Sequence, residues 1–592
     1  MRTVWLAQPN YRFGENAFLP YSVGRVWAYA AAQPDIASVY RLAGILWERE
    51  PIEQVVARMT DCDVLALSCY IWNWEYNLAL AYAVRCKFPN CWIVVGGPQV
   101  PKKGTVEFLK QHSYLDVAVL GEGERSFATV LRQIDGTLQW VYPEDRVDDL
   151  GSLPSPYLTG LFDNLLRRSD IKWQALQETN RGCPYQCTFC DWGSATYSKV
   201  RKFPLDAIGR EIAWFAANKI ELLYNCDANF GMLEQDEAIA DTLIESKRFL
   251  GYPQKFRAAY AKKITERVFS VSKKLADAGM SKGATISFQS LHEPTLNVIK
   301  RLNPVQKSLA ETFAKYNTAN IATYTELIIG LPGETYTTFA DGIDQLLEAG
   351  QHTGLAIYPC MMLKNSEMSD TLYREAHGIE IARCRQLLMH GTAGIHDVTE
   401  WYDLVIATST MPHEDWQQAY ELGWIVMALH CSGLTMDIAK AVRGSYTNRS
   451  VNFYENLLAF ADAFPQTTIG RELQNIRRML DRVLIGGPWG TVDEKFGAVS
   501  WPPEELSYLR LLLVREEFTR DIHDFLWMTH WYDTDMRRLL QQAAEGWPNP
   551  FHETWGGDLE VFAREVVWYG RKGGVKYKNE VKAISTATAR GY

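Results

Sequence analysis

The sequence predicts an α/β fold made of two parallel-sheet regions followed by a mainly helical C-terminal region. Short apolar runs alternate with helical patterns over residues 1–150, and the same alternation resumes from residue 171. Such alternation is typical of strands joined by crossover helices, which build parallel sheets. Long helical patterns replace it after about residue 380. We therefore expect domains at 1–150, 171–380 and 381–592, with the Leu-Pro-Ser-Pro-Tyr segment in a linker at 151–170.

The composition limits the class of protein. The 592 residues are 47% hydrophobic and 22% charged, which is typical of a soluble globular protein. The net charge of -9 argues against a nucleic-acid-binding surface, and no apolar run reaches the length of a membrane span. The eleven scattered cysteines indicate reduced thiols in the cytoplasm. We expect neither nucleic acid nor a membrane as a partner.

The first region predicts a doubly wound parallel sheet. Its expected strands are Thr3–Ala7, Val64–Cys69, Trp92–Val95 and Asp116–Leu120, with Ser38–Leu46 strand-like or mixed. Its expected helices are Val23–Ala32, Trp74–Cys86 and Glu124–Arg132. Ligands of such sheets bind beyond the carboxyl ends of the strands. The loops at those ends carry the candidate ligand contacts Ser68, Cys69, Tyr70, Gly96, Gly97, Pro98, Gln99, Gly121, Glu122 and Gly123.

The second region, residues 171–380, predicts a partial parallel (β/α) barrel. Its six expected strands are Trp173–Thr179, Leu222–Asn225, Lys255–Ala259, Gly283–Phe288, Ala322–Ile329 and Gly354–Tyr358. Helical patterns such as Leu205–Ala217 and Glu266–Ala278 separate them. Catalytic residues of barrels lie at the carboxyl ends of the strands.

The C-terminal region shows long helical patterns, for example Arg471–Leu484 and Glu504–Phe525. It is rich in tryptophan, leucine, arginine and glutamate. We expect it to cap the barrel and to help define the substrate pocket, and its tryptophans favour a bulky or apolar substrate.

Three cysteines follow the first barrel strand, in the run Glu-Thr-Asn-Arg-Gly-Cys-Pro-Tyr-Gln-Cys-Thr-Phe-Cys-Asp-Trp-Gly at 178–193. Cys183, Cys187 and Cys190 have the spacing Cys-x3-Cys-x2-Cys, and no other Cys or His follows before Cys226. Thiolates suit iron–sulfur clusters and zinc, but a closed zinc site takes four protein ligands. Three thiolates can hold three irons of a cubane cluster and leave the fourth open to a small molecule. A zinc knuckle and three unrelated core cysteines are the alternatives.

This loop, with Phe189 just before the third cysteine, resembles the cluster loop of the radical S-adenosylmethionine (radical SAM) superfamily. The resemblance implies a 4Fe-4S cluster on the three cysteines, with S-adenosylmethionine bound to the open iron. Reductive cleavage of the sulfonium then releases a 5′-deoxyadenosyl radical. An external electron donor, such as flavodoxin or ferredoxin, is implied as well.

Two later segments resemble the S-adenosylmethionine contacts of the same superfamily. The segment Tyr-Asn-Cys-Asp-Ala-Asn-Phe-Gly at 224–231 implies that Asp227 and Asn229 orient the methionine amino group. The segment Ile-Ile-Gly-Leu-Pro-Gly-Glu at 328–334 is similar to the adenine-side motif and implies contacts from Gly330 and Gly333. Each segment alone is equally compatible with an ordinary turn.

Residues after the fourth barrel strand complete this set. Gln289 and Ser290 resemble residues that face the ribose and methionine parts of the cofactor. Arg301 is expected to meet the carboxylate, because its guanidinium fork suits two oxygens. The order of these segments after the cysteine loop favours the family over chance.

The glycine-rich runs of the first region, Val-Val-Gly-Gly-Pro-Gln at 94–99 and Gly-Glu-Gly-Glu at 121–124, resemble the cobalamin-binding domain of one radical SAM class. Small residues there let the backbone approach a large flat ring. The alternative is a nucleotide-type sheet whose glycines only make turns. The Asp-x-His-x-x-Gly loop that ligates cobalt in many cobalamin domains is missing, since the first histidine is His112. We expect a lower cobalt face that is open or held by water or a non-histidine group, unless the pocket is vestigial.

The leading functional hypothesis is a cobalamin-dependent radical SAM methyltransferase acting on an unactivated carbon of a small-molecule or peptide substrate. A second hypothesis is a radical SAM epimerase or rearrangement enzyme, in which Cys226 or Cys360 returns a hydrogen atom to a substrate radical. A third is a non-catalytic metal-binding module.

Overall fold

The computed structural model describes residues 1–192, 199–281, 283–301, 309–352, 354–391 and 398–570. The chain forms two compact units. The first comprises Met1–Lys282, Met362–Tyr373 and Gly394–Tyr402, and the second comprises Gly283–Met361, Arg374–Ala393 and Asp403–Tyr592. The division falls inside the expected barrel, so the domain limits at 150, 170 and 380 stay a prediction. Residues 392–397 and 571–592 of the expected 381–592 domain lie outside the described residues.

The first unit contains a six-stranded parallel sheet in the order β3-β1-β4-β5-β6-β7. Its strands are β1 (Arg2–Asn10), β3 (Tyr40–Glu48), β4 (Val64–Ser68), β5 (Trp92–Gly96), β6 (Val117–Val119) and β7 (Val141–Tyr142). The doubly wound parallel sheet expected from the sequence is thereby confirmed. The mixed segment after Ser38 is mainly strand, and the short edge strand β7 was not expected.

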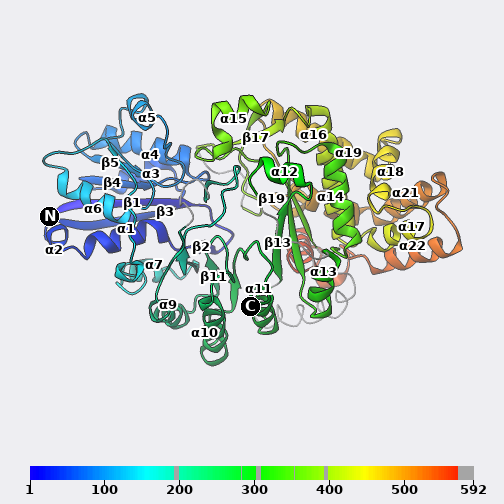
Figure 1. The fold of residues 1–592 in the computed structure, drawn as a ribbon, viewed down its shortest axis with the longest axis horizontal. Coiled ribbons are helices and arrows are strands. Elements are labelled where there is room, and N and C mark those ends of the chain that lie inside the picture. The colour runs from blue at the N-terminus through cyan, green and yellow to red at the C-terminus, as the bar shows by residue number, and fades with distance from the viewer. Residues whose placement is uncertain (193–198, 282, 302–308, 353, 392–397, 571–592) are drawn as a thin grey trace. The chain divides into compact units, whose positions relative to one another are not determined.

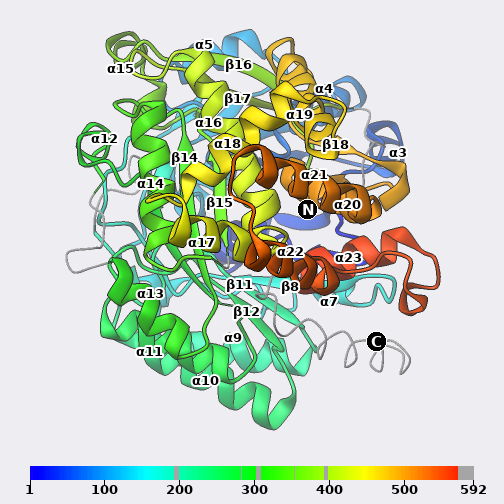
Figure 2. The same cartoon turned by 90° about the vertical axis from the view of Figure 1, so that its right-hand side faces the viewer.

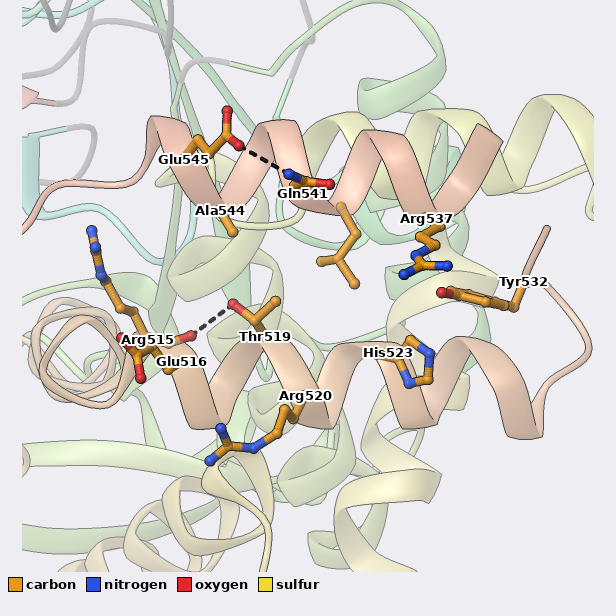
Figure 3. Close-up of a pocket in the computed structure, with 11 residues that line it drawn as sticks. Arg515, Glu516, Thr519, Arg520, His523, Tyr532, Arg537, Gln541, Ala544 and Glu545 are labelled. Carbon is orange, nitrogen blue, oxygen red and sulfur yellow. Dashed lines mark hydrogen bonds between the residues drawn. The ribbon is translucent and has the colours of Figure 1, made fainter. Parts of the chain in front are cut away.

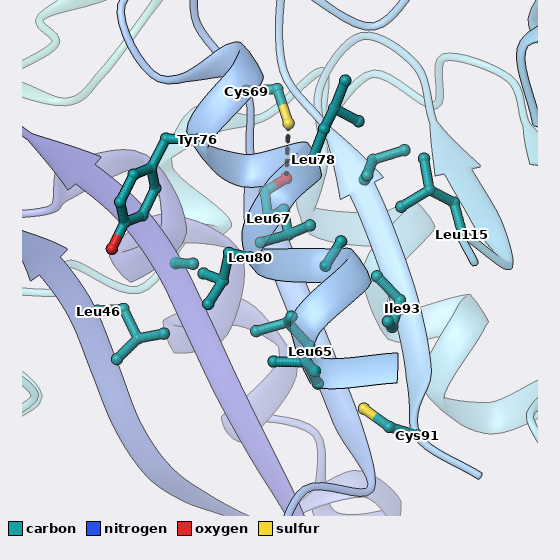
Figure 4. Close-up of a cluster of buried hydrophobic side chains, with 14 of the residues drawn as sticks. Leu46, Leu65, Leu67, Cys69, Tyr76, Leu78, Leu80, Cys91, Ile93 and Leu115 are labelled. Carbon is teal, nitrogen blue, oxygen red and sulfur yellow. Dashed lines mark hydrogen bonds between the residues drawn. The ribbon is translucent and has the colours of Figure 1, made fainter. Parts of the chain in front are cut away.

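Helices cover both faces of this sheet (Figure 1). One face carries α1 (Tyr21–Ala31), α2 (Pro34–Ala37) and α6 (Glu124–Gln133), and the other carries α3 (Ile52–Arg58), α4 (Trp74–Lys87) and α5 (Thr105–Gln111). Side chains of a strand point alternately to opposite faces. Val64 and Ala66 therefore pack under α1 and α6, whereas Leu65 and Leu67 pack with Leu80 of α4 (Figure 4). Burial on both faces explains why the strand sequences are continuous apolar runs.

A second sheet of the first unit is four-stranded and parallel, in the order β12-β11-β8-β2. Its strands are β2 (Asn16–Phe18), β8 (Lys172–Gln177), β11 (Leu222–Asn225) and β12 (Lys255–Arg257), and its helices are α9 (Leu205–Ala217), α10 (Gln235–Leu250) and α11 (Glu266–Asp277). The first three expected barrel strands are thereby confirmed. The expected linker contains α7 (Asp163–Leu166) and the fully buried Tyr157 and Phe162, so it packs as part of the unit.

Two short strands, β9 (Asn180–Arg181) and β10 (Arg201–Lys202), pair antiparallel with Arg181 opposite Arg201. The cysteine loop lies between them in the sequence. The two strands therefore form its stems.

Two later segments of the chain, Met362–Tyr373 and Gly394–Tyr402, belong to the first unit. In the second of them Glu400 pairs with Arg49 at 2.5 Å, and both side chains are 0% exposed. Glu400 also accepts the amide N–H groups of Glu75 and Tyr76 at the start of α4, at 2.8 and 3.0 Å. Burial raises the pKa of Glu400 even though Arg49 opposes the shift.

The second unit contains the remaining expected barrel strands as a three-stranded parallel sheet, β13-β14-β15. These are β13 (Ala284–Gln289), β14 (Thr323–Ile329) and β15 (Leu355–Pro359), with helices α12 (Glu293–Val298), α13 (Leu309–Thr318) and α14 (Tyr336–Glu348). All six expected strands are present, three in each unit.

The C-terminal part of the second unit is mainly helical, as expected (Figure 2). Helix α16 (His413–Ile425) packs against α14 and α18 (Val451–Ala463), and α18 packs against α19 (Thr468–Leu484). The other elements are α15 (Thr371–Ala376), α17 (Met436–Ser445), α20 (Pro503–Leu513), α21 (Arg515–Met528), α22 (Thr534–Gly546), α23 (Leu559–Gly570) and the paired strands β16 (Glu380–Arg385) with β17 (Trp401–Ala407) and β18 (Thr491–Val492) with β19 (Ser500–Trp501).

One helix expected from the sequence is divided into two in the structure. The pattern at Glu504–Phe525 predicted a continuous helix, but α20 ends before Val514 and α21 begins after it. Val514 has φ -118° and ψ 33°, outside the helical range. Neither glycine nor proline marks this break, so the sequence carried no local signal for it.

Among the described residues, no single helix is long and apolar enough to span a membrane. The pair His413–Cys431 and Met436–Ser445, bent by 105°, passes the criteria of length and composition only when taken together.

Candidate cofactor site

The three cysteines follow β8 in the first unit. Cys183 and Cys187 are 2% and 3% exposed, and Cys190 is half-buried. Asn229 Nδ2 donates a hydrogen bond to Cys183 Sγ at 3.3 Å, and Lys262 Nζ donates one to Cys187 Sγ at 3.3 Å. Hydrogen bonds to thiolate sulfur are one of the means by which a protein tunes an iron–sulfur cluster. The donors at both sulfurs therefore fit cluster ligands.

The spread of these side chains matters for the zinc alternative. Within the described part of the chain, no three His, Cys, Asp or Glu side chains gather around one metal position. In a cubane cluster each cysteine binds a different iron, so its ligands need not converge on one point. The spread of the three cysteines is therefore compatible with a cluster. Phe189, the aromatic residue just before the third cysteine, is half-buried.

Asp227 ties the end of β11 to the start of the cysteine loop. Its Oδ1 accepts the amide N–H groups of Thr179 and Asn180 at 2.8 and 3.1 Å. Its Oδ2 accepts the Thr179 hydroxyl and the side-chain amides of Asn180 and Asn225. Burial raises the pKa of Asp227 to about 7, against the effect of these hydrogen bonds. Because the chain itself occupies both oxygens, a contact of Asp227 with S-adenosylmethionine stays a prediction.

Asn229 has a buried side-chain oxygen that accepts no hydrogen bond from the described residues. Its side chain is 1% exposed, and its Oδ1 finds no hydrogen-bond donor among the described residues. A buried acceptor without a partner is costly, about 1–3 kcal/mol, and needs a reason. This oxygen belongs to the side chain that donates to Cys183 Sγ. It therefore fits a ligand ammonium bound beside the cluster, such as the amino group of S-adenosylmethionine.

In the second unit a buried carboxyl group follows β14. Ser290 Oγ donates to Glu334 Oε1 at 2.8 Å, while Glu334 Oε2 is buried with no hydrogen-bond partner among the described residues. Burial raises the pKa of Glu334 to about 8, so the group is largely protonated at neutral pH. Gln289, beside Ser290, has φ 68°, a left-handed conformation that is uncommon outside glycine. Sequence reasoning missed Glu334, although it ends the motif at 328–334.

Arg301, Gly330 and Gly333 also serve the local fold of the second unit. The Arg301 guanidinium donates to the carbonyl oxygens of Ser287 and Phe288, the latter at 3.1 Å, and is 3% exposed. Gly330 and Gly333 have φ 88° and 89°, which suit glycine in a turn. Their contacts with S-adenosylmethionine stay predictions.

The candidate cobalamin loops all follow strands of the six-stranded sheet at its carboxyl edge. Gly97 has φ 99°, and a Cβ there would lie 2.7 Å from Cys69 O. The amide N–H of Cys69 donates to Gly96 O at 2.8 Å, and that of Gln99 donates to Cys69 O at 3.1 Å. Glycine at position 97 is therefore required by the close approach of two loops, whether or not a ring binds there.

The same edge carries two aromatic rings stacked on each other. Tyr70 and Trp72 stack with ring centroids 4.5 Å apart and planes 9° apart, and the hydroxyls of Tyr70 and Ser22 lie 2.5 Å apart. Ser68 is half-buried, and burial raises the pKa of the Cys69 thiol to about 12. None of these loops carries a histidine, so the expected non-histidine lower face stays a prediction.

Glu122 behaves differently from its glycine neighbours. Gly121 has φ 69°, and Gly123 precedes the first residue of α6. Between them the Glu122 carboxylate forms ion pairs with Arg181, at 3.2 Å, and with Arg201. The structure therefore places this candidate cobalamin contact on the stems of the cysteine loop.

Burial keeps the two candidate hydrogen-donor cysteines in the protonated thiol form. Burial raises the pKa of Cys226 well above its ordinary value and that of Cys360 to about 12. The Cys226 amide donates to Gln177 O at 2.8 Å, and Cys360 follows β15 in the second unit. Both remain neutral thiols at neutral pH.

A segment missed by sequence reasoning connects the two loop regions of the first unit. Asn365 Nδ2 donates to the carbonyl oxygens of Pro98 and Val100 at 2.7 and 2.8 Å. Three residues later, the Met368 amide donates to Thr188 O in the cysteine loop at 2.9 Å. Residues 362–373 thus bind both the expected cobalamin edge and the expected cluster loop.

Two further polar clusters lie in the second unit. His352 Nδ1 and His430 Nε2 are 2.9 Å apart, and His430 Nδ1 lies 2.7 Å from the Tyr454 hydroxyl. Burial lowers the pKa of His352 to about 4, with a further contribution from Lys440.

A groove with a volume of about 680 Å³ lies between α21 and α22, and polar side chains line it (Figure 3). Arg515, Arg520 and Arg537 line it together with Glu516 and Glu545. Side chains of both charge signs therefore line the groove.

Comparison with known proteins gives two close relatives, although no family model matches the chain. The cobalamin-dependent radical SAM methyltransferase TokK of Streptomyces tokunonensis is 36% identical over 477 residues, which cover 77% of this chain and 70% of TokK. A 2-(S-pantetheinyl)-carbapenam-3-carboxylate methyltransferase of Streptantibioticus cattleyicolor is 35% identical over 491 residues, covering 79% of this chain and 72% of that enzyme.

Solved structures share the fold. OxsB, a cobalamin-dependent S-adenosylmethionine radical enzyme with aqua-cobalamin and S-adenosylmethionine bound, matches with a TM-score of 0.53 at 14% identity, over 92% of this chain and 83% of OxsB. TsrM of Kitasatospora setae, with cobalamin and a [4Fe-4S] cluster bound, matches with a TM-score of 0.51 at 13% identity, over 71% of this chain and 88% of TsrM. These similarities concern the fold alone.

Proposed function

The chain belongs to the cobalamin-dependent radical SAM methyltransferases, and we propose that it methylates an unactivated carbon of a small-molecule substrate. Its cofactors are a 4Fe-4S cluster, S-adenosylmethionine and cobalamin. Both relatives are methyltransferases. The epimerase or rearrangement alternative and the non-catalytic module are therefore not favoured.

The relatives suggest a substrate with which to begin. One of them is named for 2-(S-pantetheinyl)-carbapenam-3-carboxylate. We propose that compound, or a carbapenam close to it, as the substrate of this chain. The identity of 35% over 79% of the chain supports the choice.

The proposed site residues fall into three groups. Cys183, Cys187 and Cys190 hold the cluster. The proposed S-adenosylmethionine contacts are Phe189, Asp227, Asn229, Gln289, Ser290, Arg301, Gly330 and Gly333. The proposed cobalamin contacts are Ser68, Cys69, Tyr70, Gly96, Gly97, Pro98, Gln99, Gly121 and Gly123.

A single observation supports the assignment: the Asn229 side chain donates to the Cys183 sulfur, and its buried Oδ1 has no donor among the described residues. When bound, the cluster and S-adenosylmethionine supply a 5′-deoxyadenosyl radical, and cobalamin supplies the methyl group. Asn229 would accept a hydrogen bond from the methionine amino group. Lys262 would donate a hydrogen bond to the Cys187 sulfur and hold its positive charge beside it.

We also propose an external electron donor, such as flavodoxin or ferredoxin, and a reducing compartment such as the cytoplasm. All eleven cysteines are reduced thiols in the structure, which suits such a compartment.

The test is anaerobic reconstitution with iron, sulfide, cobalamin and S-adenosylmethionine, followed by addition of the pantetheinyl carbapenam. We expect 5′-deoxyadenosine, S-adenosylhomocysteine and a methylated product. Cys187→Ala should lose cluster iron and all 5′-deoxyadenosine, whereas the control Cys226→Ala should keep both. Equal 5′-deoxyadenosine from Cys187→Ala and the parent would disprove the cluster assignment. Deuterium from solvent in an unmethylated product would instead favour the epimerase alternative.

A further inference from the structure

Both stems of the cysteine loop carry an arginine at the same position of their short ladder. Arg181 of β9 and Arg201 of β10 are direct partners in this antiparallel pair. Side chains directly opposite each other in such a pair lie close together, and two like charges there repel. The pairing therefore needs an anion between the two guanidinium groups.

Glu122 supplies that anion. Its Oε2 lies 3.2 Å from Arg181 Nη1 and 3.2 Å from Arg201 Nη1, and its Oε1 also binds Arg201. The three side chains are 12%, 10% and 6% exposed, so the contact is largely shielded from solvent. Glu122 lies between two glycines on the loop after β6, at the carboxyl edge of the six-stranded sheet.

The two stems depend on Glu122 to different degrees. Arg181 keeps two other anions, because it pairs with Glu124 at 2.7 Å and with Glu178 at 2.9 Å. The charge of Arg181 holds the pKa of Glu124 below its ordinary value although burial opposes this. Among the described residues, Arg201 has Glu122 as its carboxylate partner and otherwise donates to the carbonyl oxygen of Val147. Loss of Glu122 would free the β10 stem first.

We propose that Glu122 is a positioning residue, which clamps both stems of the cluster loop to the edge of the sheet that carries the cobalamin loops. This inference rests on the proposed function. Substrate carbon, radical and methyl donor must meet within a small distance. A displacement of about 1 Å in such an arrangement can cost of the order of 10²-fold in rate. In this proposal the clamp sets that spacing, and Glu122 acts through the loop stems rather than through a cofactor.

The test measures spacing directly, so that it needs no turnover. The holoenzyme is prepared with the paramagnetic cobalt(II) form of cobalamin and with the cluster reduced. Electron paramagnetic resonance then reports the spin–spin effect of the cluster on the cobalt signal. The variants are Glu122→Gln, which keeps the shape but not the charge, and Arg201→Lys, which keeps the charge but not the fork. Asp145→Asn is the control, because Asp145 forms an exposed pair with Arg125 at 3.4 Å.

We expect both variants to keep the iron and cobalamin content of the parent but to show a changed spin–spin effect, with the control unchanged. With substrate, the ratio of 5′-deoxyadenosine to methylated product should rise by about tenfold or more in both. An unchanged spin–spin effect in Glu122→Gln would overturn the inference. Loss of the cluster in both variants would also overturn it, because Glu122 would then be needed for folding of the loop. A parent that makes no methylated product would refute the proposed function, whereas the spectroscopic result would still decide the role of Glu122.

Discussion

Replacement of Asp227 by alanine tests whether one buried carboxylate holds the start of the cysteine loop. The substitution removes the acceptor of five hydrogen bonds. Side-chain donors can turn to other partners, but the amide N–H groups of Thr179 and Asn180 cannot. Each buried donor left without an acceptor costs about 1–3 kcal/mol, so the two amides together cost about 2–6 kcal/mol. Burial of the carboxylate, which raises the pKa of Asp227 to about 7, offsets part of this and favours the lower half of that range.

The assay is amide hydrogen exchange of residues 172–183 together with iron content after reconstitution. Asp227→Ala should exchange faster in this segment and retain less iron, whereas Asp227→Asn, which keeps an acceptor oxygen, should lose less. The matched control is Asp206→Ala, since Asp206 forms an exposed pair with Arg210 and its loss should cost about 0.5 kcal/mol or less. If Asp227→Ala exchanges like this control in residues 172–183, the carboxylate does not hold the loop.

Three further substitutions address other features. Gly97→Ala forces a Cβ against a neighbouring loop and should lower the melting temperature and the retention of cobalamin. The control Gly209→Ala, which has open space around it in a helix, should instead stabilise the folded protein by about 0.5–1 kcal/mol. Equal effects of the two substitutions would refute the close-approach argument. Glu400→Ala leaves the Arg49 charge buried without its partner and should cost about 3–5 kcal/mol in urea unfolding of the first unit; a loss under about 1 kcal/mol would contradict this. The pKa of His352 is depressed to about 4 in the fold, so its contribution to stability is present above about pH 6.5 and is lost as the pH falls towards 4. His352→Asn should therefore flatten the decline of the melting temperature between these pH values. An unchanged slope would refute this reasoning.

The parts of the fold visible in the sequence are those with a local pattern. Strands such as Val64–Ser68 and Trp92–Gly96 are buried on both faces, so each reads as a continuous apolar run between polar ends. The spacing of Cys183, Cys187 and Cys190 is likewise local, because one loop supplies all three ligands. These features were predicted for the same reason: neighbours in the sequence carry the whole signal.

The missed features depend on residues far apart in the chain. Asn365 binds the loop at Pro98 through single hydrogen bonds, which leave no periodicity to detect. The ion pairs of Glu122 with Arg181 and Arg201 left no local signal, because both arginines follow much later in the sequence. The free Oδ1 of Asn229 is visible only when every nearby donor has been placed.

The return of Glu400 to Arg49 has a consequence for synthesis on the ribosome. The N-terminal lobe leaves the exit tunnel long before its last buried carboxylate has been translated, so a nascent lobe holds a guanidinium that has no counter-charge. Chaperone engagement or protease cleavage at this stage would act on a lobe whose sheet is complete but whose α4 start is still loose. Ribosome-arrested chains whose 398–402 segment is still inside the tunnel should therefore be much less resistant to a brief protease pulse than longer chains in which this segment has emerged.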